Sequence, residues 1–221
     1  MRVLQKNGCE VEIPSGQGCC GALHLHSGLR EDARRLARRN IDAVLPGGFD
    51  AIISNAAGCG STLKEYGELL ADDPEYAGKA REFSSLMRDV TEFLASIELN
   101  PDMAPVNATV TYQDSCHLAH GQHIRTAPRK LLAAVPGLTF RAMPSSDVCC
   151  GSAGIYNVVQ NQMSMQILAH KMEAVNSTGA GIIATANPGC LLQLQAGVRL
   201  HGSGQRVMHV VEILDEAYRA K

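Results

Sequence analysis

The sequence predicts an α/β protein built from two related cysteine-rich repeats, each a mainly parallel sheet flanked by helices. Short apolar runs alternate with segments of helical periodicity along the chain, which is typical of strand–helix units. In addition, a Cys-Cys-Gly motif followed by a Gly-Cys motif occurs twice, which indicates two copies of one unit.

The spacing of the cysteines defines the repeat. Cys20 and Cys59 are 39 positions apart, and Cys150 and Cys190 are 40 positions apart. A leading cysteine, Cys116, precedes the second Cys-Cys pair by 33 positions, and its counterpart in the first copy would fall before the first residue. Because the copies are about 130 positions apart, the pattern indicates duplicated domains rather than a solenoid.

A second pair of similar segments lies outside the cysteine motifs. Residues 89–94 read Asp-Val-Thr-Glu-Phe-Leu, and residues 209–214 read His-Val-Val-Glu-Ile-Leu. Proline and asparagine punctuate residues 98–106, which marks a boundary. We expect a first repeat over residues 1–100, incomplete at its amino terminus, and a complete second repeat over residues 106–221.

The first half of the chain is expected to alternate between short strands and helices. Residues 30–45 carry apolar side chains at helical spacing and stop at a Pro-Gly-Gly run. The predicted strands are residues 11–13 and 51–53, and the predicted helices are residues 30–45, 62–70 and 81–97.

The second half follows the same alternation, and two of its strands run directly into a cysteine motif. Residues 109–112 lead into Asp-Ser-Cys116, and residues 182–184 lead into Asn-Pro-Gly-Cys190. The other predicted elements are a strand over residues 138–142 and helices over residues 125–135, 163–175, 191–200 and 210–218.

The key cysteines are expected where a strand ends and a helix or loop begins. Ligand sites in open α/β sheets gather outside the carboxyl ends of strands. A helix amino terminus also favours the thiolate, which is the form that binds metal. Cys9 has no counterpart in the second repeat and is left out. The candidate metal ligands are Cys19, Cys20, Cys59, Cys116, Cys149, Cys150 and Cys190.

The cysteine spacing favours an iron–sulfur cluster over a single zinc ion. Structural zinc usually has two close Cys-x2–4-Cys pairs, and the sequence has no Cys-x-x-Cys. Adjacent cysteines can instead reach two irons of a larger cluster, which is usually held by thiolates alone. Zinc, a thiol redox role and plain burial of the cysteines are the alternatives.

Histidines follow the leading cysteine of the second repeat. His117, His120 and His123 are three positions apart, so on a helix they would share one face. His117 and His120 are therefore candidate cofactor-binding residues. The alternative is that they are polar residues at a helix entry near a charged centre.

Composition excludes several functions. The net charge of −2 gives no basis for binding nucleic acid, and no apolar run approaches the roughly 20 residues that span a bilayer. No export signal precedes the cysteines, so we expect a reducing, cytoplasmic environment.

No dinucleotide or phosphate-binding loop appears, and no nucleophile–His–carboxylate set can be argued from the spacing. The chain is therefore expected to hold a redox centre and not to catalyse substrate chemistry alone.

Five segments resemble the cysteine-rich "CCG" domain, which occurs in heterodisulfide reductases and in iron–sulfur subunits of flavin-linked dehydrogenases. Within that group the sequence motifs are most similar to the carboxy-terminal region of glycolate oxidase (glycolate dehydrogenase) iron–sulfur subunits. The resembling segments are spread along most of the chain: residues 14–24, 55–61, 114–122, 149–157 and 187–190.

The resemblance implies an electron-transfer subunit with an iron–sulfur cluster of the 4Fe–4S type. Such a subunit passes electrons from a flavin-containing partner, which oxidises glycolate to glyoxylate, to an acceptor such as quinone. It would lie in the cytoplasm, peripheral to the inner membrane through its complex. The alternatives are a related lactate or glycerol-3-phosphate dehydrogenase subunit, or a thiol–disulfide redox module like heterodisulfide reductase.

The sequence departs from the family pattern in two ways. Full-length members carry an N-terminal ferredoxin-like segment with two 4Fe–4S clusters, so this chain is expected to be a carboxy-terminal part of such a protein. The fuller motif can also end Cys-x-x-Cys, whereas Thr62 and Gln193 stand at the last positions here. This weakens the case for the atypical heterodisulfide-type cluster.

Overall fold

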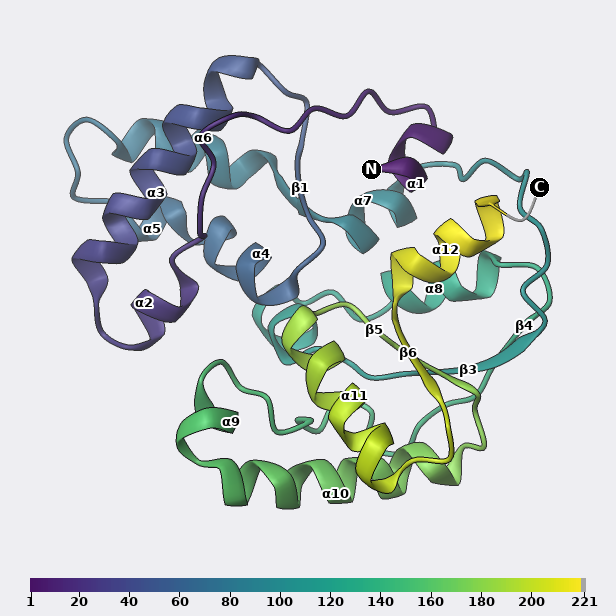
Figure 1. Ribbon diagram of the computed structural model, residues 1–221. Coiled ribbons are helices and arrows are strands. Elements are labelled where there is room, and N and C mark those ends of the chain that lie inside the picture. The colour runs from purple at the N-terminus through teal and green to yellow at the C-terminus, as the bar shows by residue number, and fades with distance from the viewer. Residues whose placement is uncertain (220–221) are drawn as a thin grey trace. The chain divides into compact units, whose positions relative to one another are not determined.

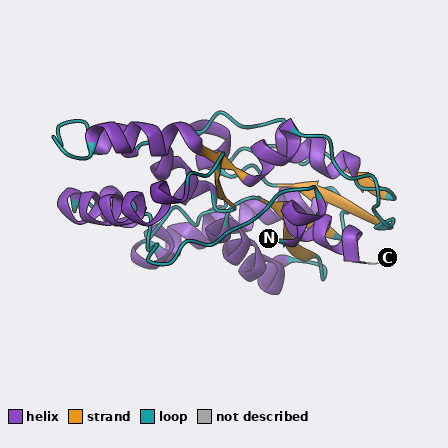
Figure 2. Ribbon diagram, turned by 90° about the horizontal axis from the view of Figure 1, so that it is seen from above, coloured by secondary structure: helices purple, strands orange, loops and turns teal. Residues whose placement is uncertain are grey.

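The computed structural model describes residues 1–219, and its contacts divide the chain into two units. The smaller unit is Val11–Val90, and the larger unit combines Met1–Glu10 with the chain from Thr91 onward. Each unit has parallel strands with helices beside them and holds one Cys-Cys-Gly motif (Figures 1 and 2). The predicted class, an α/β protein with two cysteine-rich repeats, is therefore confirmed.

The first ten residues belong with the larger unit because of contacts near the two chain ends. Helix α1 (Arg2–Lys6) packs against α12 (Val210–Arg219). The Arg2 guanidinium donates to both carboxylate oxygens of Asp215, at 2.8 and 2.6 Å. The bounds predicted for the sequence repeats, 1–100 and 106–221, stay a prediction.

The smaller unit is built on a two-stranded parallel sheet and a helical layer. Strand β1 (Ile52–Ser54) pairs with β2 (Met87–Asp89). The longest helix of this unit is α3 (Arg30–Val44), and its first turn contains Glu31 and Asp32, whose charges stabilise a helix amino terminus. The helices are α2 (Ala22–His26), α3 (Arg30–Val44), α4 (Ala57–Lys64), α5 (Tyr66–Leu69) and α6 (Ala77–Leu86), with a 3-10 turn at Leu45–Gly47.

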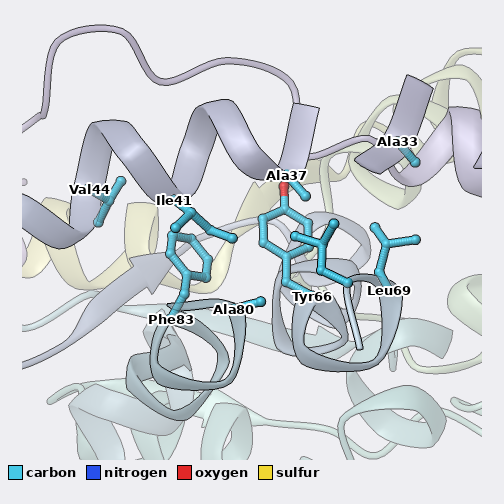
Figure 3. Close-up of a cluster of buried hydrophobic side chains, with 9 residues drawn as sticks. Ala33, Ala37, Ile41, Val44, Tyr66, Leu69, Ala80 and Phe83 are labelled. Atoms are coloured by element: carbon cyan, nitrogen blue, oxygen red, sulfur yellow. The ribbon is translucent and has the colours of Figure 1, made fainter. Parts of the chain in front are cut away.

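The core of the smaller unit lies between α3, α5 and α6 (Figure 3). Small side chains on α3, including Ala33 and Ala37, let this helix approach the aromatic rings of Tyr66 and Phe83. The two rings stack with their centroids 5.3 Å apart. The Tyr66 hydroxyl donates a hydrogen bond to the Cys20 carbonyl oxygen at 2.9 Å. The core therefore fixes the backbone of the first Cys-Cys-Gly motif.

The larger unit is built on a four-stranded, fully parallel sheet in the order β4-β3-β5-β6. Its strands are β3 (Ala108–Tyr112), β4 (Leu138–Phe140), β5 (Ile182–Thr185) and β6 (Arg206–His209). All four residues of β5 are buried, as expected for a central parallel strand.

Helices cover both faces of this sheet. Figure 1 shows α10 and α11 on one side of the strands and α8 and α12 on the other. The remaining helical elements are α7 (Val90–Ser96), which begins at the unit boundary, η2 (His117–Gly121), α8 (Ala127–Ala134), α9 (Tyr156–Val159), α10 (Asn161–Ser177) and α11 (Pro188–His201). No helix among residues 1–219 is both long and apolar enough to span a bilayer.

The two units repeat the same strand pairing. The pair β1–β2 matches β5–β6 with the same register, once β1 is shifted by 131 positions and β2 by 120. Ser54 opposite Asp89 thus corresponds to Thr185 opposite His209. The similar segments 89–94 and 209–214 occupy the same place, where a strand passes directly into α7 or α12.

The structure differs from the sequence prediction at three short strands. Residues 11–13 form no strand, and Ile13 is exposed just before a proline. The predicted helix over residues 81–97 is divided into α6, β2 and α7, because Met87 and Asp89 alternate with exposed Arg88 in a strand pattern. Strand β6 was not predicted.

Candidate metal centre

Four cysteines of the larger unit come from three segments that are distant in the sequence. Cys116 follows β3, and Cys190 lies in the first turn of α11, just after β5. Because β3 and β5 are parallel neighbours, these two residues lie at the same edge of the sheet. Cys149 and Cys150 lie in the loop between β4 and α9.

The four thiols form a continuous series of contacts. Hydrogen bonds join Cys116 to Cys149, Cys149 to Cys150, and Cys150 to Cys190. Cys150 and Cys190 are buried, whereas Cys116 and Cys149 are half-buried. All four are free thiols. The structure thus brings together the four cysteines predicted as ligands in the second repeat.

These contacts determine which thiols hold protons. Hydrogen bonds from Cys116 and Cys150 lower the pKa of Cys149 to about 2. The same bonds, ahead of burial, raise the pKa of Cys116 and of Cys150. The bond from Cys150 lowers the pKa of Cys190 to about 7, and Asn187 Nδ2 contributes at 3.7 Å from its sulfur. Thiols that share protons in this way become a set of thiolates when a metal replaces the protons.

The smaller unit brings three predicted ligands together. Cys59 lies in the first turn of α4, and a hydrogen bond from Cys20 lowers its pKa to about 7. That bond, together with burial, raises the pKa of Cys20. Cys19 is exposed, and its carbonyl oxygen accepts a hydrogen bond from Asn40 at 3.0 Å.

The two Cys-Cys-Gly loops share one local geometry. Gly21 has φ +83° and Gly151 has φ +94°, in the region that favours glycine. Each glycine N–H donates to the sulfur of the first cysteine of its motif, at 3.4 Å for Cys19 and 3.3 Å for Cys149. A left-handed glycine thus turns the backbone so that its N–H stabilises negative charge on that sulfur.

The chemistry of the donors fits an iron–sulfur cluster. The donor set of the larger unit is four thiols, and all-thiolate ligation is the usual way that such clusters are held. Within the described part of the chain, no group of three or more His, Cys, Asp or Glu side chains is arranged to hold one metal ion. The fit therefore depends on the thiols of separate segments binding different irons of one larger group.

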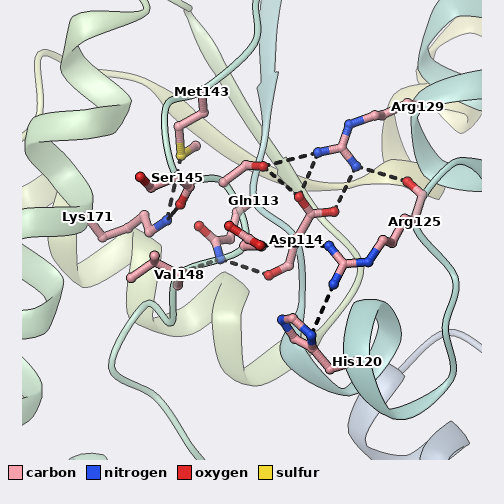
Figure 4. Close-up of polar contacts among 11 residues, drawn as sticks. Gln113, Asp114, His120, Arg125, Arg129, Met143, Ser145, Val148 and Lys171 are labelled. Atoms are coloured by element: carbon pink, nitrogen blue, oxygen red, sulfur yellow. Dashed lines mark hydrogen bonds and ion pairs between the residues drawn. The ribbon is translucent and has the colours of Figure 1, made fainter.

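A buried ionic network connects the segment before Cys116 to the loop before Cys149 (Figure 4). The Asp114 carboxylate accepts two hydrogen bonds from Arg129, at 2.7 and 2.6 Å, and one from Ser146 at 2.7 Å. Burial opposes the charge of Asp114, but the bonds from Arg129 and Ser146 outweigh it and lower the pKa of Asp114. Two of the segments that carry the thiols are therefore fixed to each other.

A buried amine lies beside the same loop. Lys171 is 3% exposed, and its Nζ donates to the Ser145 carbonyl oxygen at 2.7 Å and lies 3.9 Å from Met143 Sδ (Figure 4). Met143 belongs to the same apolar cluster as Cys150. Burial lowers the pKa of Lys171, and the electrostatic effect of the Cys150 and Cys149 sulfurs opposes it.

Comparison with known families agrees with this arrangement. The family model described as "CCG: Cysteine-rich domain" matches residues 1–64 and 110–195, which include all seven candidate cysteines. The chain belongs to the CCG cysteine-rich domain family. The two matched segments correspond to the two repeats of the CCG fold seen in the structure.

Two relatives of this CCG chain are named as iron–sulfur subunits, and others are named for lactate utilization. It is 46% identical to the "Probable glycolate oxidase iron-sulfur subunit" of Bacillus subtilis, over 98% of this chain and 50% of the relative. It is 36% identical to the "Glycolate oxidase iron-sulfur subunit" of Escherichia coli, over 98% of this chain and 52% of the relative. It is 32% identical to "Lactate utilization protein A" of Bacillus subtilis, over 97% of this chain and 90% of the relative. The chain thus spans about half the length of the glycolate oxidase subunits it matches.

The histidines after Cys116 do not form the expected helical face. Residues His117–Gly121 form a π-helix, whose wider turn does not place residues three apart above one another. His123 lies beyond this helix with φ +58°. His120 Nδ1 lies 3.1 Å from the Arg125 guanidinium. A role of His117 and His120 in binding the cofactor stays a prediction.

Sequence reasoning missed the charged residues that surround the CCG thiols. Asp114 and Arg129 are separated by 15 positions, and Lys171 meets Ser145 across 26 positions. One local signal was available, since Asp114 directly follows a buried apolar strand, where an acidic side chain requires a partner.

We expect Asp114→Asn to destabilise the larger unit by about 2–4 kcal/mol at pH 7, because it leaves the Arg129 charge without its partner. Since folding lowers the pKa of Asp114, its charge stabilises the protein above the unfolded pKa of about 3.9. That contribution declines as pH falls below about 3.9 and is lost only below the folded pKa, so the difference between variant and wild type should shrink below about pH 4. Urea unfolding at pH 7 and pH 3 measures both effects.

The exposed ion pair of Glu216 with Arg206 supplies the control. Glu216→Gln should cost less than about 1 kcal/mol at either pH, because water screens the pair. A cost of Asp114→Asn that matches this control at pH 7 would contradict a structural role for the network.

Proposed function

We propose that this chain is the cysteine-rich part of an iron–sulfur electron-transfer subunit of a glycolate oxidase complex. A flavin-containing partner oxidises glycolate to glyoxylate, and this subunit passes the electrons to an acceptor such as quinone. The observation that carries the proposal is the convergence of four thiols from three segments at one sheet edge: Cys116, Cys149, Cys150 and Cys190. The names of the relatives supply the substrate.

The residues around the thiols suit them to a centre that changes its charge. An iron–sulfur cluster, when bound, takes up and releases electrons one at a time. The Gly151 N–H and the Asn187 amide donate to Cys149 and Cys190, which stabilises negative charge on those sulfurs. The network of Asp114 and its partners keeps the cysteine segments in place during electron transfer.

The four thiols differ in burial, so one side of the site is more accessible to a partner than the other. Cys150 and Cys190 face the apolar cluster of the larger unit, whereas Cys116 and Cys149 are partly exposed. Electron transfer is fastest over short distances, so the side of Cys116 and Cys149 is where we place the approach of a redox partner. Oxidation of the 2-hydroxy acid itself is assigned to the flavin-containing partner.

A second candidate partner is a lactate-oxidising flavoprotein. It is favoured by the likeness to "Lactate utilization protein A", of which this chain matches 90% of the length. Both candidates give the subunit the same electron-transfer role and differ only in the 2-hydroxy acid. In either case we place the complex in the cytoplasm and peripheral to the inner membrane, and we expect no nucleic-acid partner.

Anaerobic purification of the tagged full chain from its own host tests the proposal. We expect a brown protein that contains iron and acid-labile sulfide and copurifies with a flavoprotein. The complex should reduce a dye with glycolate. A complex that reacts with lactate and not with glycolate would replace the first candidate by the second. A colourless protein that holds only zinc would contradict both.

A further inference from the structure

The two CCG repeats place different residues at one equivalent position beside the cysteine loop. The fourth residue of α3, Ala33, and the fourth residue of α10, Ser164, each lie against the glycine of their Cys-Cys-Gly motif. A Cβ on Gly21 would lie 3.2 Å from Ala33 Cα, and a Cβ on Gly151 would lie 2.5 Å from the Ser164 carbonyl oxygen. The two helices therefore pack on their loops in the same register.

In this register, the eleventh residue of α3 is Asn40 and the eleventh residue of α10 is Lys171. Both side chains are buried, at 4% and 3% exposure. Asn40 accepts from the Gly18 N–H at 2.8 Å and donates to the Cys19 carbonyl oxygen at 3.0 Å, so it fixes its loop without a charge. Lys171 donates to the Ser145 carbonyl oxygen, at the base of its loop.

Among the described residues 1–219, no carboxylate forms an ion pair with Lys171. Of the two acidic residues that act on its charge, Asp114 is paired with Arg129 at 2.6 Å, and Asp147 lies 3.8 Å from Arg125. The Cys150 and Cys149 sulfurs also act on the amine. A buried ammonium requires compensation, and these two sulfurs would supply it when they bind a metal as thiolates.

We propose that Lys171 provides a buried positive charge that compensates the thiolates of the second CCG repeat and raises the reduction potential of the centre they hold. The inference rests on the proposed iron–sulfur function. A thiolate-ligated cluster adds negative charge beside the amine, which favours the ammonium form. Reduction adds one further electron, so a fixed nearby cation stabilises the reduced state more than the oxidised state. Asn40 leaves the first repeat without this cation.

The test uses the full chain reconstituted anaerobically with iron and sulfide. Lys171→Met keeps an apolar side chain of similar length and removes the charge, whereas Lys171→Arg keeps the charge. We expect the midpoint potential of Lys171→Met to shift to a more negative value, and that of Lys171→Arg to stay close to wild type. Redox titration monitored by absorbance and EPR measures the potentials, and iron and sulfide analysis measures cluster content.

Lys130→Met is the matched control, because it removes one positive charge from the surface of the same unit, where water and salt screen it. Loss of the cluster in Lys171→Met but not in Lys171→Arg would support the proposal. Equal shifts in Lys171→Met and Lys130→Met, loss of the cluster in both Lys171 variants, or an unfolded Lys171→Met apoprotein would overturn it. A wild-type chain that takes up no iron and sulfide would contradict the proposed function instead.

Discussion

Replacing Cys149 with serine is expected to remove the iron–sulfur centre of the larger unit. Cys149 contacts both Cys116 and Cys150, so it lies in the middle of the series of thiols. Serine has nearly the same size, but its hydroxyl does not become an anion at neutral pH and is a poor ligand for iron. Loss of a residue that merely orients a ligand already costs about 10–100-fold in metal affinity, and loss of a direct ligand should cost at least as much.

Anaerobic reconstitution followed by iron and sulfide analysis measures this effect. We expect Cys149→Ser to lose the iron and sulfide bound by the larger unit and the associated visible absorbance. The variant apoprotein should still unfold cooperatively in urea, because Cys149 is half-buried and its replacement is nearly isosteric. A lost cluster in a folded apoprotein separates ligand loss from misfolding.

Cys9→Ser is the control for nonspecific thiol effects. Cys9 is half-buried and lies outside both Cys-Cys-Gly motifs, and its Sγ lies 3.9 Å from the Asn7 carbonyl oxygen. Its replacement should leave iron, sulfide and absorbance unchanged. If Cys9→Ser and Cys149→Ser bind equal amounts of iron and sulfide, Cys149 is not a ligand.

The positions of Cys116 and Cys190 could be predicted because their signal is local. Each follows a short apolar run that is buried as a central strand, β3 or β5, and parallel strands end at a common edge. The sequence repeat then indicated that the Cys-Cys-Gly loop belongs with them.

Strands β2 and β6 escaped prediction because each has only three or four residues and passes directly into a helix. The predicted helix over residues 81–97 includes β2, because no glycine or proline lies between the strand and α7. The residues of β6 fall in no predicted element. The similarity of residues 89–94 to residues 209–214 was visible, but a short strand paired through a distant partner leaves little local pattern.

The charged surroundings of the thiols could not be predicted for a different reason. A lysine in the middle of a helix is ordinarily solvent-exposed, and the periodicity of α10 does not distinguish Lys171 from an exposed position. Its burial depends on the loop that contains Ser145, which the sequence places 26 positions away. The equivalence of Lys171 and Asn40 becomes visible only when α10 and α3 are compared residue by residue in the folded structure.

Replacing Gly151 with alanine is expected to destabilise the larger unit by about 2–5 kcal/mol. Two costs combine: the left-handed backbone at φ +94° costs an alanine about 1–2 kcal/mol, and crowding in a packed site adds about 1–3 kcal/mol. The crowding is severe because the new Cβ would lie 2.5 Å from the Ser164 carbonyl oxygen, which is helix backbone and cannot move aside alone.

Gly204→Ala separates these two costs. Gly204 has φ +91°, close to that of Gly151, but a Cβ built on it meets no atom within 4 Å. It should therefore lose only the backbone contribution of about 1–2 kcal/mol. Chemical unfolding of the two apoproteins under reducing conditions measures the difference, and equal losses would show that the contact with α10 does not constrain the loop.

The same substitution at Gly151 should also weaken the metal centre. Ser164 Oγ donates to the Gly151 carbonyl oxygen at 2.8 Å and accepts from Gln193 Nε2 at 3.0 Å, so the loop is held against both α10 and α11. Moving Gly151 away from α10 would break the first of these bonds and turn its N–H away from the Cys149 sulfur. Gly151→Ala should therefore bind less iron and sulfide than Gly204→Ala even where both proteins are folded, because the glycine positions the loop as well as allowing it to turn.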